Sequence, residues 1–262
     1  MYNQILKLVD NNPQIIKLGL DRTYKLFNLC NNPQNSLSIV QIAGTNGKGS
    51  VSAMLANVFY KNNVKIGLYT SPHLNSFKER IQINFKPIED HEIEIFINKY
   101  KKHIKEAKVT FFELMTVLAL WHFKKNKVNI AILETGLGGR LDSVTASHAS
   151  ALIITSISKD HEKTLGPTLL DIAGEKAGAI LSTTKSISSA EQSPKIKNVL
   201  NNRAEKFNKK INYASKNYLK NYKFLYLHGR HQYQNGNLAY HSIIRIADLF
   251  EFKVNNISKH IL

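Results

Sequence analysis

The sequence predicts an α/β fold in which a mostly parallel sheet is flanked by helices. Three observations support this class: short apolar runs alternate with helical patterns, a glycine-rich turn joins the first run to the next helix, and polar residues follow several runs. Alternation of this kind is typical of βαβ units around a parallel sheet. With 262 residues, the chain is long enough to bury its own core as a single domain.

Strands are expected where apolar and β-branched residues run together without interruption. Such runs occur at residues 38–43 (SIVQIA), 65–70 (KIGLYT), 129–133 (NIAIL) and 151–155 (ALIIT). Their nearly continuous hydrophobicity is typical of strands that are buried on both faces, as they are in a parallel sheet.

Helices are expected where apolar residues recur at spacings of three and four. This spacing occurs at residues 50–61, 91–108, 112–125, 168–180 and 237–250. The stretch 91–108 carries lysines opposite its apolar face, whereas 112–125 is more apolar throughout. After about residue 182 the pattern weakens until the last helix, and no closing element is evident after it.

The charge of the chain is strongly basic, with 36 Lys+Arg against 19 Asp+Glu and a net charge of +17. Only six of the basic residues are arginines, although bidentate phosphate recognition and base readout usually depend on arginine. The composition leaves open a solvated basic face or a surface that attracts polyanions. No basic motif interleaved with aromatic residues supports nucleic-acid binding, so we expect none. Anionic substrates would be attracted under either reading.

Cysteine content and hydropathy restrict the class of protein further. Cys30 is the only cysteine, which excludes an internal disulfide framework and a cysteine zinc site. No apolar run approaches the roughly 20 residues of a membrane helix, and the first residues do not resemble a signal peptide. We therefore expect a cytoplasmic, monomeric protein with no membrane partner.

The glycine-rich turn is predicted to bind phosphate. It lies between the first strand and its helix and reads Gly44-Thr45-Asn46-Gly47-Lys48-Gly49-Ser50. Glycines let successive N–H groups point inward, and the helix N-terminus adds its positive dipole end. Lys48 would reach the β- and γ-phosphates, and Ser50 could face a magnesium ion. The strict P-loop pattern is not met, because Ile42 stands where its first glycine should be, and a tight structural turn is the alternative.

Polar residues follow the other predicted strands, where ligands bind in open parallel sheets. Ser71 follows the second strand, Glu134 follows residues 129–133, and Asp160 and His161 lie shortly after residues 151–155. A carboxylate, an imidazole and a hydroxyl that face a phosphate loop are plausible Mg²⁺ ligands. Glu134 alone could equally be a structural strand-end acid. Lys176 by itself is more typical of a surface lysine with a buried stem.

Several segments together resemble the folylpolyglutamate synthase/dihydrofolate synthase family of the Mur ligase superfamily. The segments are AGTNGKGS at 43–50, TSPH at 70–73, FFELMT at 111–116, GLGGRLD at 136–142, EKAG at 175–178 and GRHQYQN at 229–235. They follow the family's order over nearly the whole chain. The resemblance implies a P-loop domain like the central domain of Mur ligases, spanning residues 1–262.

The resemblance also implies an activity and its cofactors. Members of this family are ATP- and Mg²⁺-dependent amide ligases that add L-glutamate to dihydropteroate, tetrahydrofolate or both, through an acyl phosphate. The resemblance assigns the ATP phosphates to residues 44–50 and the adenine to Asn235. It makes Ser71 and Glu134 magnesium ligands, with His161 and Lys176 serving a second magnesium.

Further roles come from the same resemblance. Lys48, His161 and Lys176 would be the catalytic residues, and Lys176 is expected to be carbamylated, which turns a cation into an anionic oxygen ligand. Phe112 and Asp142 match positions that line the pterin pocket of the family. The substrates would thus be a pterin or folate and L-glutamate.

The family carries a second, C-terminal domain that helps to bind glutamate, and its Asp-Gly-Ala-His-Asn-Pro-type motif does not occur after Asn235. We therefore expect this chain to lack the C-terminal glutamate-ligase domain. The alternatives are a ligase completed by a separately encoded C-terminal partner, and a truncated remnant that binds Mg·ATP but does not ligate by itself.

Overall fold

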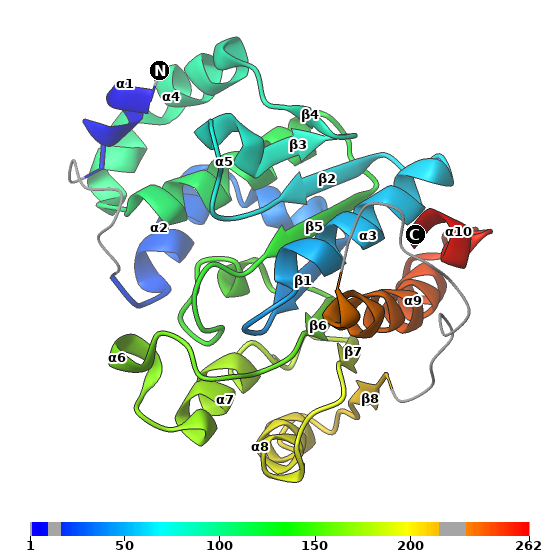
Figure 1. Ribbon diagram of the computed structural model, residues 1–262. Coiled ribbons are helices and arrows are strands. Elements are labelled where there is room, and N and C mark those ends of the chain that lie inside the picture. Colours follow the sequence, from blue (N-terminus) through cyan, green and yellow to red (C-terminus); the bar gives the residue numbers. More distant parts are fainter. Residues whose placement is uncertain (1, 10–16, 215–228, 262) are drawn as a thin grey trace.

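The computed structural model describes residues 2–9, 17–214 and 229–261, and its centre is a sheet of eight strands (Figure 1). The strand order is β4-β3-β2-β5-β1-β6-β7-β8. The neighbouring strands from β2 through β8 in this order pair in parallel, and β3 pairs antiparallel with both β2 and β4. The predicted fold class, a mostly parallel sheet flanked by helices, is confirmed. The strands are β1 (Ile39–Ala43), β2 (Ile66–Tyr69), β3 (Ile81–Ile83), β4 (Lys86–Pro87), β5 (Ile130–Glu134), β6 (Ala151–Ile154), β7 (Ser186–Ser189) and β8 (Asn212–Tyr213).

Helices cover both faces of this sheet (Figure 1). The helices are α1 (Tyr2–Leu6), α2 (Asp21–Leu29), α3 (Lys48–Lys61), α4 (Asp90–Ala107), α5 (Phe111–Lys125), α6 (Glu162–Leu165), α7 (Leu169–Ala177), α8 (Pro194–Glu205), α9 (Arg230–Phe250) and α10 (Ile257–Ile261). Three short 3₁₀ turns occur at Pro33–Ser36, Phe77–Arg80 and Thr145–Ser147.

Alternate residues of the strands pack against different groups of helices, as the two-residue period of a strand requires. In β6, Ala151 and Ile153 belong to the cluster formed with α3, α9 and α10, whereas Leu152 and Ile154 pack with α7 and α8. Helices α2, α4 and α5 form a third cluster, which includes Ile39 of β1. Both faces of the central strands are therefore buried, which explains their continuous hydrophobicity.

The predicted strands and helices are present, but the sequence missed several elements. The β3–β4 hairpin is short and partly exposed, so it carries little apolar signal. Strand β7 consists of Ser-Ile-Ser-Ser, and its buried serines hide it from a hydrophobicity pattern. Helix α9 begins at Arg230, whereas the sequence predicted a start at residue 237. The prediction began too late because the first turns of α9 are polar. Within the described ranges, no helix is long and apolar enough to cross a bilayer.

The carboxyl ends of β1, β2, β5 and β6 lie at one edge of the sheet, since these strands are parallel neighbours. After β1, the chain forms β2 and β5 on one side of β1, and it later forms β6 on the other side of β1. Such a point of divergence leaves a crevice at the carboxyl edge, where ligands bind in open α/β sheets. The glycine-rich turn, Ser71, Glu134 and the segment before α6 all lie at this edge.

Candidate functional site

The glycine-rich turn lies between β1 and α3, and its shape depends on glycine. Gly47 has φ +88° directly before α3, and a Cβ at Gly44 would collide with the Thr155 side chain. Both positions therefore need glycine. The Thr45 N–H donates to the Ser156 carbonyl at 2.9 Å, which ties the turn to the segment after β6. The N-terminus of α3 consequently offers N–H groups and its dipole to an anion.

Two lysine side chains converge on the carbonyl oxygen of Gly44. Lys48 Nζ donates to the carbonyls of Gly44 and Thr45 at 3.3 and 3.0 Å, and Lys176 Nζ donates to that of Gly44 at 2.8 Å. Lys176 lies in α7 and is only 3% exposed. Burial first, and then repulsion by Lys48, lower the pKa of Lys176 to about 8. Lys176 is therefore a buried amine beside the phosphate-binding turn and not a surface lysine.

The carboxylate of Glu134 ends β5 and faces the start of α3. The Ser71 N–H donates to Glu134 Oε2 at 3.1 Å. A Cβ at Gly49, in the first turn of α3, would lie 3.7 Å from the same oxygen. Burial raises the pKa of Glu134, while the Ser71 N–H, Lys48 and Arg80 act in the opposite direction. The structure thus brings Ser71 and Glu134 together beside the glycine-rich turn.

His161 lies at the start of α6 with φ +51°, and its Nε2 is 3.6 Å from Asp160 Oδ2. It lines the same cavity as Lys48 and Ser71. The Lys176 amine donates to the Gly44 carbonyl, and no hydrogen bond joins it to His161 within the described part of the chain. A hydrogen bond therefore joins Ser71 and Glu134, the predicted ligands of the first magnesium, but not His161 and Lys176, which were predicted to serve the second.

The donor set fits Mg²⁺ only if a nucleotide supplies further ligands. Among the described residues, no group of three or more His, Cys, Asp or Glu side chains could hold a metal. Glu134 and the Ser71 hydroxyl are hard oxygen donors, and Mg²⁺ is usually held by one or two carboxylates together with phosphate oxygens and water. The residues present suit a magnesium ion that arrives with phosphate.

A cavity of about 500 Å³ extends from the glycine-rich turn to Phe112 and Asp142. Asp142 is 6% exposed and accepts hydrogen bonds from the N–H groups of Leu137 and Val144 at 2.8 and 2.9 Å. Burial raises the pKa of Asp142 to about 6, although these N–H groups oppose the shift. The Phe112 ring packs against Gly136, where a Cβ would lie 2.5 Å from Cζ of the ring. One end of the cavity is thus aromatic, with a buried carboxylate beside it.

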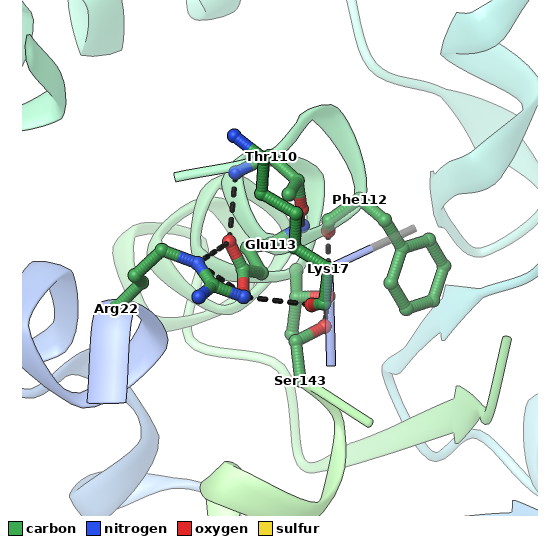
Figure 2. A network of polar contacts seen from close by, with 7 residues as sticks. Lys17, Arg22, Thr110, Phe112, Glu113 and Ser143 are labelled. Atoms are coloured by element: carbon green, nitrogen blue, oxygen red, sulfur yellow. Dashed lines mark hydrogen bonds and ion pairs between the residues drawn. The ribbon is translucent and has the colours of Figure 1, made fainter. Parts of the chain in front are cut away.

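A polar network forms the wall of the cavity beside Phe112 (Figure 2). Arg22 Nη2 donates to Glu113 Oε1 at 2.8 Å and to the Lys17 carbonyl at 2.7 Å. The Thr110 N–H donates to Glu113 Oε2 at 2.7 Å, as part of a capping box at the start of α5. This network holds the first turn of α5, and with it Phe112, against α2.

The sequence analysis did not single out this network. The Thr110–Glu113 capping box is visible as T-x-x-E before an apolar run, but its partner Arg22 lies 91 residues earlier in the chain than Glu113. A second missed feature is a pair of hydroxyls, Thr116 Oγ1 and Ser143 Oγ, which are 2.6 Å apart under the cavity wall. Pairings over such separations follow from the fold and leave no local signal.

Asn235 lies in α9 and packs against the glycine-rich turn. A Cβ at Gly47 would collide with its carboxamide. Asn235 Nδ2 donates to Gln232 Oε1 at 3.0 Å, and Gln232 Nε2 donates to Ser50 Oγ at 3.4 Å. Because the predicted helix began at residue 237, the sequence analysis missed Gln232, which connects α9 to the first turn of α3.

Comparison with known proteins finds dihydrofolate synthases and folylpolyglutamate synthases among the relatives. No family model matches the chain. It is 36% identical over 198 residues to the dihydrofolate synthase/folylpolyglutamate synthase of Bacillus subtilis, covering 73% of this chain and 46% of that protein. It is 42% identical over 171 residues to the dihydrofolate synthetase of Saccharomyces cerevisiae, covering 63% and 40%. The chain therefore spans less than half the length of these relatives.

Solved structures of folylpolyglutamate synthase resemble the fold over 99% of this chain. The apo form from L. casei has a TM-score of 0.89 at 25% identity and is covered over 71% of its length. A complex of this kind of enzyme with AMPPCP and folate has a TM-score of 0.85 at 25% identity, with 71% covered. The Mycobacterium tuberculosis enzyme, complexed with ADP and AMPPCP, has a TM-score of 0.82 at 28% identity, with 64% covered. In sequence and in fold, the chain is therefore a relative of the dihydrofolate synthase/folylpolyglutamate synthase family.

Proposed function

We propose that residues 1–262 form the ATP-binding unit of an amide ligase that adds L-glutamate to dihydropteroate, tetrahydrofolate or both. One observation carries the proposal: a single cavity is lined by Lys48 of the glycine-rich turn and by Phe112 and Asp142. A nucleotide phosphate and an aromatic ring system could therefore occupy it together. The relatives that bind AMPPCP and folate support this pairing of ligands.

The proposed role of residues 44–50 is to bind the phosphates of ATP. Backbone N–H groups at the start of α3 would donate to phosphate oxygens, and Lys48 would move from the carbonyls of Gly44 and Thr45 to the β- and γ-phosphates. Asn235, which packs against Gly47, is proposed to contact the adenine. Phosphoryl transfer requires mainly such positioning and charge neutralisation.

The proposed reaction has two steps. A carboxylate oxygen of the pterin-bearing substrate attacks the γ-phosphorus, and the bond to ADP breaks, which leaves an acyl phosphate. The glutamate amine then attacks the acyl carbon and phosphate departs. Ser71 and Glu134 would hold one Mg²⁺, with His161 and Lys176 serving a second. These ions would neutralise charge on the transferred phosphoryl group.

Lys176 is proposed to act in its carbamylated form, in which the neutral amine has attacked CO₂ and released a proton. Because its pKa is lowered to about 8, the neutral fraction of the amine rises as pH increases through that value. We expect a lysine carbamate signal in ¹³C NMR with ¹³C-bicarbonate that is larger at pH 8.5 than at pH 6.5. The signal should vanish in Lys176→Gln; persistence in that variant would contradict the assignment.

The aromatic end of the cavity can be tested with Gly136→Ala. The added Cβ would lie 2.5 Å from Phe112 Cζ, so the ring must move. Overpacking of this kind costs about 1–3 kcal/mol, and we expect binding of dihydropteroate to weaken about tenfold. Binding of ATP should change less than about twofold, because the phosphate end is untouched. Isothermal titration calorimetry would measure both.

Gly174→Ala is the matched control for this substitution. Gly174 is exposed within α7, and nothing lies within 4 Å of an added Cβ. Alanine should therefore stabilise the helix by up to about 1 kcal/mol and leave both affinities unchanged. Equal loss of dihydropteroate binding in the two variants would contradict the proposed ring site.

The proposed function is tested by release of phosphate from Mg·ATP by this chain, with and without glutamate and dihydropteroate or tetrahydrofolate. Release that depends on both substrates, together with the new amide, would support the ligase. Binding of Mg·ATP without amide formation would favour the alternative, a nucleotide-binding unit that does not ligate alone. Adding the C-terminal domain of a relative in trans then separates a split ligase from an inactive remnant.

A further inference from the structure

Arg80 occupies a position in the cavity that the sequence analysis did not single out. It ends the 3₁₀ turn Phe77–Arg80, directly before β3, and its half-buried side chain lines the cavity together with Lys48, Ser71 and Phe112. Its guanidinium carbon lies 5.6 Å from the centre of the Phe111 ring. The guanidinium therefore lies close to the aromatic residues of a cavity that Lys48 of the glycine-rich turn also lines.

The charge of Arg80 is not neutralised within the described part of the chain. Two other arginines near the cavity are each paired with a carboxylate: Arg22 with Glu113 and Arg140 with Glu175, both at 2.8 Å. Arg80 has no such ion pair; its Nε donates instead to Nδ1 of His73 at 2.9 Å. An arginine has five N–H donors in a planar fork that matches a carboxylate. A half-buried, unneutralised guanidinium at the cavity wall is therefore suited to an anionic ligand.

We propose that Arg80 binds the carboxylate of the pterin-bearing substrate and holds it toward the glycine-rich turn. The assignment rests on the proposed function, in which this carboxylate attacks the γ-phosphate. A ring bound at Phe112 would lie in the cavity that Arg80 and Lys48 also line, so its carboxylate would face the same space as both side chains. Because the guanidinium remains charged at any working pH, it also stabilises the negative charge that stays on the acyl phosphate.

The experiment compares two ligands that differ only in the anion. One is dihydropteroate, and the other is the same compound with hydrogen in place of its carboxyl group. The wild-type chain should bind dihydropteroate about 10–100-fold more tightly, as expected for a charge-assisted hydrogen-bonded pair. Arg80→Gln should lose this preference, because only the binding of dihydropteroate weakens. Arg80→Lys should restore part of the preference.

Lys78→Gln is the matched control, because it removes one positive charge from the same 3₁₀ turn. The Lys78 amine pairs with Asp90 at 3.1 Å, outside the cavity that Arg80 lines. Lys78→Gln should keep the wild-type preference for dihydropteroate over the carboxyl-free compound. Unchanged binding of the carboxyl-free compound shows that the Arg80→Gln variant is folded and its ring site intact.

Three results would overturn the assignment. The wild-type preference could persist in Arg80→Gln, or that variant could weaken both ligands equally, as a purely structural role through His73 predicts. In either case the proposed function stands and only the role of Arg80 fails. If the wild-type chain binds neither ligand, both the proposed function and the role of Arg80 are wrong.

Discussion

Replacing Lys48 by alanine is expected to weaken the binding of Mg·ATP by about 100-fold or more, since each hydrogen bond from a charged donor contributes about 1.5–3 kcal/mol. Within the described part of the chain, this amine bonds only to the carbonyls of Gly44 and Thr45 in the same turn. Its removal should therefore leave the fold intact. Calorimetric titration with AMPPCP, together with a thermal unfolding curve, measures both effects.

The control for this variant is Lys61→Ala. Lys61 ends the same helix, α3, on the exposed surface far from the turn. Lys61→Ala removes the same charge from the chain as Lys48→Ala, so long-range electrostatics change equally in the two variants. The contact of Lys48 with the glycine-rich turn is kept in this control. Unchanged nucleotide affinity in Lys48→Ala, or an equal loss in both variants, would contradict the assignment of the phosphate-binding turn.

Glu134→Gln is expected to abolish the contribution of Mg²⁺ to nucleotide binding, an effect of about 10–100-fold in affinity for one lost charged ligand. Glutamine keeps the shape of the side chain and can still accept from the Ser71 N–H. Without Mg²⁺, in EDTA, the variant should bind AMPPCP at least as tightly as the wild type, because a negative charge beside the phosphates is gone. Comparing the affinity for AMPPCP with Mg²⁺ and in EDTA separates an effect on metal binding from an effect on the fold.

The pH dependence gives an independent check on Glu134. Burial raises the pKa of this carboxyl, so it binds a proton at a higher pH than an ordinary glutamate. As pH falls, the wild-type Mg²⁺ effect should therefore fade earlier than expected for an exposed carboxylate. Glu92→Gln removes a carboxylate that pairs with Lys125 on the other side of α5 and should behave as wild type. A Mg²⁺ effect that survives in Glu134→Gln would exclude this residue as a ligand.

The sequence predicted the parts of the molecule that depend on local patterns. Apolar runs identified the central strands, because a strand buried on both faces must be hydrophobic at nearly every position. The turn at residues 44–50 was recognisable because only glycine accommodates the backbone at Gly44 and Gly47. The polar residues at the strand ends followed from the parallel topology, which puts all carboxyl ends at one edge.

Other parts of the site became visible only in the tertiary structure. The partner of Glu113 is Arg22, that of Ser50 is Gln232, and the Lys176 amine meets the carbonyl of Gly44. Each contact joins side chains by geometry, and no periodic pattern encodes it. The burial that lowers the pKa of Lys176 is likewise a property of the packed chain, whereas the residue pattern without the family resemblance indicated a surface lysine.

The sequence by itself thus determined the fold class, the phosphate-binding turn and the set of side chains at the edge of the sheet, since these follow from residue type and period along the chain. The tertiary structure alone decided how the side chains face one another. It joined Lys48 of the glycine-rich turn and Phe112 in one cavity and paired Arg22 and Arg140 with carboxylates, whereas Arg80 has no carboxylate partner among the residues that the structure describes. Such pairings depend on distances in space between residues far apart in sequence, which only the packing of helices on the sheet fixes.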